Sequence, residues 1–122
     1  MQLSRDSSAV NFIRAWEPGR VRVGDRWLAG NVLVGSDALV ESWTTTAASR
    51  LTIAELEPAL ALHPTIIVLG TGTERLLPDV ELMAAVAARS VGLEIMNTPA
   101  ACRTFNVLLQ EQRRVVAALF NP

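Results

Sequence analysis

Two loops in the second half of the chain hold the residues best placed to bind a ligand. The apolar run Ile66–Leu69 leads into a glycine-flanked turn, and Thr98 with Pro99 opens a predicted helix further on. Glycines let backbone N–H groups approach a ligand, and a helix N-terminus stabilises an anion. If both loops meet at one sheet edge, they would form a shallow site for a small polar or anionic group. The residues expected to bind this ligand or a partner are Gly70, Thr71, Gly72, Thr98, Cys102, Arg103 and Asn106.

The same residues also have a purely structural interpretation, which the sequence leaves open. The glycines could form a tight strand exit that requires positive φ. Thr98 would then be the N-cap of a helix with Pro99 at its first position, while Arg103 pairs with an acid and Asn106 bonds the backbone. A dinucleotide-binding fingerprint is excluded, because Arg75 stands where a third glycine is required and no helix begins at once.

Cys102 suggests a third interpretation, nucleophilic catalysis by a thiolate near a helix N-terminus. Such a thiolate needs a basic neighbour, and no spacing pairs Cys102 with His63, the one imidazole of the chain. A buried cysteine more commonly acts as a small hydrophobic group, and His63 is expected to be exposed in a turn before Pro64. One cysteine and one histidine also exclude an internal disulfide and a Cys/His metal site. We therefore predict no catalytic residue, no metal and no cofactor.

Composition excludes several function classes. The chain has 122 residues, 50% of them hydrophobic and 19% charged, and a mean hydropathy of +0.29, so it should fold as one ordered domain. A net charge of −1 gives no electrostatic footprint for nucleic acid. All basic residues are arginine, which excludes Schiff-base and phosphate-binding lysines. No apolar run reaches the length of a membrane span and the first residues lack a secretory signal, so a cytoplasmic location is expected.

The first half of the chain is rich in short alternating segments separated by glycine and aspartate turns. This pattern predicts a meander of small antiparallel strands at residues 20–23, 26–29, 32–34 and 39–43. Thr52 and Glu55 then have the spacing of a capping box, which predicts a helix over about 53–62 that Pro64 ends.

The second half predicts an alternation of strands and helices. The β-branched run 65–69 is typical of a buried parallel strand. Pro78 at a first helical position predicts a helix over 79–90 with Val80, Met83, Ala84 and Ala87 toward the core. A strand at 93–95, a helix from Thr98 to about 109 and a last strand at 114–120 complete a β-α-β-α-β order. That order favours an α/β fold with right-handed crossovers.

These blocks together resemble one known family. They are Leu69–Gly72, Pro78, Ile95–Leu108 and Arg113–Leu119, with Trp43 and a Thr-capped helix upstream. The combination resembles family 498 of the domains of unknown function, the Mth938-like domains, over about residues 10–120. The resemblance implies a three-layer α/β fold with a mixed central sheet and an additional small antiparallel β-layer. The resemblance implies no catalytic residues for this chain, because none are agreed for the family. One departure is Gln112, where the family typically has glycine before the arginine of its last strand.

The predicted organisation is a tail at residues 1–10 and a single α/β domain over 11–122. The predicted function is a non-catalytic binding or assembly module, since relatives in the family include a mitochondrial complex I assembly factor. The predicted module could assist the assembly of a respiratory or membrane complex. Alternatives are an anion-binding protein using Gly70–Gly72 and Thr98, and a thiol enzyme using Cys102. The expected partner is another protein, or else a small anionic ligand, with neither nucleic acid nor membrane insertion. The expected state is a monomer or weak homodimer.

Overall fold

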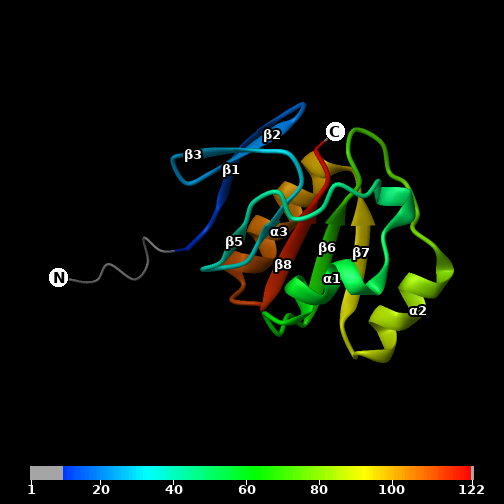
Figure 1. Ribbon diagram of the computed structural model, residues 1–122. Coiled ribbons are helices and arrows are strands. Elements are labelled where there is room, and N and C mark those ends of the chain that lie inside the picture. The colour runs from blue at the N-terminus through cyan, green and yellow to red at the C-terminus, as the bar shows by residue number, and fades with distance from the viewer. Residues whose placement is uncertain (1–9, 122) are drawn as a thin grey trace.

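The computed structural model describes residues 10–121, which form two β-sheets and three α-helices (Figure 1). Residues 1–9 of the predicted tail lie outside the described residues, and Val10 packs against the core. The strands are β1 (Ile13–Glu17), β2 (Arg20–Val23), β3 (Arg26–Ala29), β4 (Val32–Val34), β5 (Leu39–Val40), β6 (Ile66–Gly70), β7 (Gly92–Met96) and β8 (Val115–Leu119). The helices are α1 (Ile53–Leu60), α2 (Val80–Ala88) and α3 (Thr98–Gln110), and Ala48–Arg50 forms a 3-10 turn.

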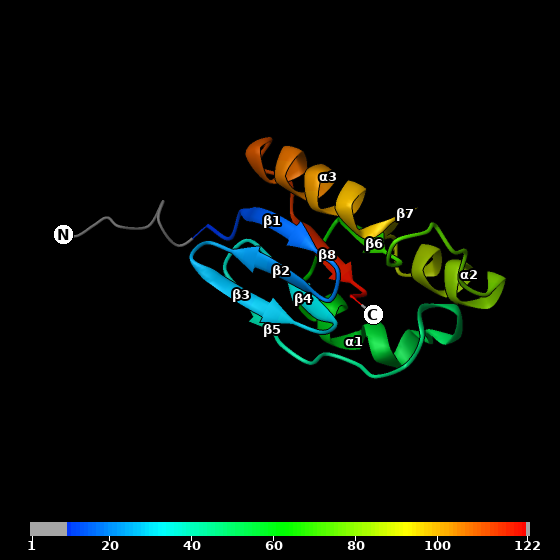
Figure 2. The same ribbon diagram turned by 90° about the horizontal axis from the view of Figure 1, so that it is seen from above.

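A five-stranded mixed sheet with the order β5-β4-β8-β6-β7 is the middle layer of the molecule. β6 pairs in parallel with β7 and β8, whereas β4 pairs antiparallel with β8. Helices α1 and α2 cover one face of this sheet (Figure 2). Helix α3 and a small antiparallel sheet, β1-β2-β3, cover the other face. The predicted three-layer α/β fold with an additional β-layer is therefore confirmed.

Strand β8 shows why the sheet must be covered on both sides. Its residues are all buried, and they alternate between the two hydrophobic cores. Val115, Ala117 and Leu119 pack on the α3 side, whereas Val116 and Ala118 pack on the side of α1 and α2. A continuous apolar run of this kind is typical of a central strand buried on both faces.

The predicted meander is wrong in its last part. β1, β2 and β3 form an antiparallel sheet, but β4 leaves it and pairs with β5 and β8 in the main sheet. The extended segment predicted over 39–43 is a strand only at Leu39–Val40. Val32, Leu33 and Val34 are all fully buried, so β4 requires apolar neighbours on both faces, which the small sheet does not supply.

Helix α1 begins as predicted and ends two residues early. The Thr52 N–H donates to Glu55 Oε1 at 3.1 Å and the capping box is present. The helix ends at Leu60, and His63, exposed as expected, takes a φ of 56° in the turn before Pro64.

Helix α2 exposes the face that was predicted to be buried. Its buried residues are Leu82 and Val86, whereas Val80 is 79% exposed and Met83 37%. Asp79 is the N-cap, so Pro78 precedes the helix instead of occupying its first position. The prediction failed because apolar residues lie on both sides of this helix. Its hydrophobic periodicity therefore does not select one face.

Two of the helices end in Schellman motifs that have no glycine. After α3, the Gln112 N–H donates to the Leu109 carbonyl and the Arg113 N–H to the Leu108 carbonyl, both at 3.0 Å. Gln112 has a φ of 62°, and Ser90 takes the same role after α2 with a φ of 60°. Glycine adopts this left-handed conformation more readily than glutamine does.

We predict that Gln112→Gly raises the free energy of unfolding by about 1 kcal/mol, because glycine adopts this backbone conformation without steric cost. Urea denaturation measures the change. Gln110→Gly is the matched control: Gln110 is the last residue of α3, and glycine there should lower stability by up to about 1 kcal/mol. A loss of stability in Gln112→Gly would contradict the prediction.

Candidate functional site

The two predicted loops do meet at one edge of the main sheet, but their polar groups bind each other. The Gly72 N–H donates to Thr98 Oγ1 at 2.8 Å, and the Thr98 N–H donates to the Gly72 carbonyl at 2.7 Å. The Thr71 N–H donates to the Met96 carbonyl at 2.9 Å. The Thr98 hydroxyl in turn donates to the Phe120 carbonyl at 2.7 Å, and Thr98 is fully buried. An anion at this position would have to displace these hydrogen bonds.

Thr98 is not the N-cap of α3, contrary to expectation. Asn97 has that role, since its Oδ1 accepts from the Ala100 N–H at 2.9 Å. Thr98 and Pro99 are the first two residues of the helix. The Thr98 hydroxyl therefore bonds the loop after β6 and the end of β8 instead of its own helix.

The two glycines of the turn have different roles. Gly72 takes the predicted positive φ, at 104°. Gly70 is required for close packing, because a Cβ there would lie 2.9 Å from the Cα of Thr98 and 3.0 Å from the Cβ of Ala101. The absence of a side chain at Gly70 thus lets α3 lie directly against β6.

The remaining predicted residues line a different groove, between β1 and α3. Cys102, Arg103 and Asn106 lie there with Arg14 and Trp16 around a volume of about 260 Å³. The Asn106 side chain is occupied, because its Oδ1 accepts from the Ile13 N–H at 2.9 Å and its Nδ2 donates to the Ile13 carbonyl at 2.8 Å.

Arg103 and Arg14 are the charged members of that groove. Both are exposed, and neither forms an ion pair within residues 10–121. The anion site predicted from Gly70–Gly72 and Thr98 stays a prediction. Of its residues, Arg103 is the one with a charged side chain, and Arg14, which was not predicted, lies in the same groove as Arg103.

Cys102 is a packing residue in the core between α3 and the sheets. Burial raises the pKa of its thiol from 9.0 to about 12, and Arg103 only partly opposes this effect. His63 precedes the first residue of β6, whereas Cys102 lies near the start of α3, where Ala101 packs against Gly70 at the other end of that strand. The thiol is therefore protonated at neutral pH and has no imidazole beside it.

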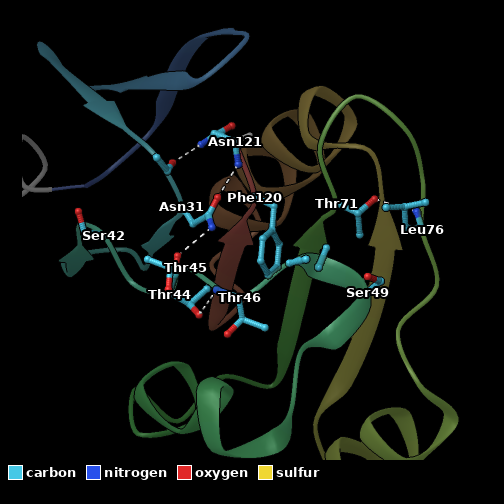
Figure 3. Close-up of a pocket in the computed structure, with 13 residues that line it drawn as sticks. Asn31, Ser42, Thr44, Thr45, Thr46, Ser49, Thr71, Leu76, Phe120 and Asn121 are labelled. Carbon is cyan, nitrogen blue, oxygen red and sulfur yellow. Dashed lines mark hydrogen bonds between the residues drawn. The ribbon is translucent and has the colours of Figure 1, made fainter.

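A cavity of about 490 Å³ lies at the carboxyl ends of β6 and β8 (Figure 3). Thr71 and Phe120, the residues that follow these two strands, line it together with the loop 42–49. Of the predicted site residues, only Thr71 belongs to this cavity. The lining residues are Gly30, Asn31, Ser42, Thr44, Thr45, Thr46, Ala47, Ala48, Ser49, Thr71, Leu76, Phe120 and Asn121.

Two asparagines hold the walls of the cavity together, as the dashed lines in Figure 3 show. The Asn31 side chain donates to the Thr44 carbonyl at 2.8 Å and accepts from the Asn121 N–H at 2.8 Å. The Asn121 side chain donates to the Gly30 carbonyl at 2.8 Å and accepts from the Trp16 indole at 3.2 Å. The amides thus join the end of β8 to the strand connection before β4 and to the loop 42–49.

Glu55 fixes the outer part of the same loop from helix α1. Its Oε2 accepts from the Thr44 hydroxyl at 2.7 Å, and its backbone carbonyl accepts from the Trp43 indole at 2.7 Å. Burial raises the pKa of Glu55, but hydrogen bonds from Thr46, Thr44 and Thr52 outweigh burial, so the pKa lies below its usual value. The carboxylate is consequently ionised at neutral pH and committed to holding the loop.

The sequence contains a signal for this cavity in residues outside the predicted site. Thr44, Thr45 and Thr46 give a run of hydroxyls directly after the predicted strand 39–43, which itself contains Ser42. Asn121 directly follows the predicted last strand, 114–120. Within residues 10–121, no group of three or more His, Cys, Asp or Glu could hold a metal ion. No helix in that range has the length and hydropathy needed to cross a bilayer.

Comparison with known proteins places the chain among proteins of this fold. A family model described as "Protein of unknown function (DUF498/DUF598)" matches residues 13–120. NADH dehydrogenase [ubiquinone] 1 alpha subcomplex assembly factor 3 of Danio rerio is 32% identical over 98% of this chain, which covers 70% of that protein. The matches to several other curated relatives cover about half the length of those proteins.

Two solved structures show the same fold over nearly the whole chain. A Bordetella parapertussis protein has a TM-score of 0.86 at 32% identity, covering 93% of this chain and 98% of that one. A Bordetella pertussis protein described as an Mth938-like domain has a TM-score of 0.81 at 26% identity, covering 99% of this chain and 92% of that one.

We predict that Thr98→Val lowers the free energy of unfolding by about 2–3 kcal/mol, because the buried Gly72 N–H and Phe120 carbonyl lose their partner. Thr98→Ser keeps the hydroxyl and loses one methyl group, so it should cost only about 0.8 kcal/mol. Chemical denaturation of both variants measures the difference. Equal losses in the two variants would show that the hydroxyl bridge contributes nothing.

We predict that iodoacetamide alkylates Cys102 at pH 7 at least about a hundredfold more slowly in the folded protein than in urea, because burial keeps the thiol protonated. Since the folded pKa is raised, the unfolded chain loses this proton first. Stability should therefore fall as the pH rises from about 9 to about 12. Mass spectrometry measures alkylation, and Cys102→Ala, which should lack this pH dependence, is the control. Fast alkylation of the folded chain would support a reactive thiol instead.

Proposed function

The chain belongs to the DUF498/DUF598 family of proteins of unknown function, and we propose that it is a non-catalytic module that helps assemble a multisubunit NADH dehydrogenase. The likeness to relatives named assembly factor 3 of NADH dehydrogenase supports this role, since it extends over nearly the whole chain. We further propose that the module works in the cytoplasm as a monomer or weak homodimer.

A cluster of exposed apolar side chains is the surface through which a partner would bind. Leu76, Leu77, Val80 and Met83 lie within eight residues of each other and are 44%, 57%, 79% and 37% exposed. We call this stretch the apolar segment; it runs from the loop after β6 into α2 (Figure 1). Large exposed apolar groups that are close together mark interaction sites more often than isolated ones do.

The energetics favour a protein partner for this segment. Full burial of a leucine or valine side chain contributes about 1.5–3 kcal/mol, so a partner that covers Leu77 and Val80 gains a substantial part of a binding free energy. The cavity beside Leu76 is lined by alcohols, amides and hydrocarbon groups, none of which titrates near neutral pH. Its lining therefore suits binding better than general acid–base chemistry.

We predict that Leu77→Glu combined with Val80→Glu abolishes the assembly function while leaving the fold intact, because both side chains are exposed and point away from the two cores. The assay uses a gene-deletion strain of the source organism, complemented with each variant. Blue native electrophoresis measures the amount of assembled NADH dehydrogenase in its membranes, and NADH–quinone oxidoreductase activity gives a second measure.

Val107→Glu is the matched control, because Val107 is 53% exposed on α3, away from the apolar segment. It should complement like the unmodified chain. Normal levels of the assembled complex in the deletion strain would refute the assembly role. Full complementation by the double variant would show that the apolar segment takes no part in the assembly role.

A further inference from the structure

The cavity of about 490 Å³ has the position of a ligand site in an α/β protein. It lies where β6 and β8 end, and these two strands run parallel to each other. Ligands of open α/β sheets bind outside the carboxyl ends of the strands. Its volume is also within the range of about 300–1,000 Å³ that is usual for small-molecule sites.

The charge of the lining restricts the class of ligand. All thirteen lining residues are uncharged. A charged group in this cavity would lose hydration without meeting an opposite charge. The Glu55 carboxylate accepts a hydrogen bond from Thr44, one of the lining residues, and lowers the affinity for anions further. These features favour an uncharged ligand.

The polar groups of the cavity divide into two sets. Asn31, Asn121, Thr44 and Thr71 have side chains committed to hydrogen bonds that hold the walls. Ser42, Thr45 and Ser49 also line the cavity, and their hydroxyls form no hydrogen bond with another group within residues 10–121. The free hydroxyls can therefore donate to or accept from a ligand on a scaffold that is already rigid.

Backbone strain occurs at the same place. Within residues 10–121, four residues other than glycine have positive φ values. His63, Ser90 and Gln112 follow the ends of helices, where a left-handed residue is common. Ser42, with a φ of 50°, follows no helix and lines the cavity. Strained residues of this kind cluster at binding sites, where the surrounding structure holds them in place.

The apolar part of the lining determines the body of the ligand. Phe120, Leu76, Ala47 and Ala48 supply hydrocarbon surface. The ring of Trp43 packs against that of Phe120 with 5.1 Å between centroids and supports this wall. We infer that the cavity binds a small uncharged molecule with a ring-sized apolar body and one or two hydrogen-bonding groups. This inference is independent of the proposed assembly role.

Two dyes that differ by one charge test this inference directly. N-phenyl-1-naphthylamine is uncharged, and 8-anilinonaphthalene-1-sulfonate has the same rings with an added sulfonate. The uncharged dye should show saturable one-to-one binding by fluorescence titration, and the sulfonate should bind at least about tenfold more weakly. Absence of saturable binding by the uncharged dye, or equal affinity for both dyes, would overturn the inference.

Substitutions then locate the bound dye. Ala47→Phe should weaken binding of the uncharged dye at least about tenfold by filling the cavity, and Ser49→Phe should act in the same way if the first variant is unstable. Ala54→Phe, at an exposed alanine of α1 outside the cavity, is the matched control and should bind normally. Leu77→Glu with Val80→Glu should also bind normally. Binding that survives both cavity substitutions, or that is lost with the apolar segment, would place the dye elsewhere and reject the site.

Discussion

The buried hydroxyl of Thr98 is the interaction on which this end of the molecule depends. It accepts from the loop after β6 and donates to the end of β8, so one side chain fixes both strand ends against the start of α3. This arrangement is possible only because Gly70 leaves room for the helix. Through Phe120 and Asn121 the bridge also determines where the walls of the 490 Å³ cavity stand. A substitution at Thr98 should therefore alter the positions of the cavity walls, although Thr98 itself does not line the cavity.

Side-chain amides join the small sheet to the rest of the fold. Asn106 of α3 bonds both backbone groups of Ile13, much as a neighbouring strand would. Asn121 accepts from Trp16 and donates to Gly30, which connects β1 and the end of β3 to the main sheet. These bonds are directional, whereas the apolar contacts beneath them are not, so the amides set the orientation of the additional layer.

The molecule has two different surfaces, one suited to a small molecule and one suited to a larger partner. The cavity is concave, uncharged and held by internal hydrogen bonds, which suits a small molecule of defined shape. The apolar segment beside it is exposed on the loop and helix that follow β6, which suits a larger partner. Leu76 belongs to both surfaces, so a ligand in the cavity would lie next to a bound partner.

The sequence by itself determined the elements whose signals are local. The capping box of α1, the buried strands β6 and β8 and the positive φ of Gly72 all follow from neighbouring residues. Only the tertiary structure decided which face of α2 is buried, that β4 leaves the small sheet, and that Asn97 caps α3 while Thr98 bonds distant strands. The cavity also arose from tertiary structure, since its walls come from segments up to 91 residues apart. Such choices depend on which surfaces and polar groups meet in space, and no local spacing encodes that.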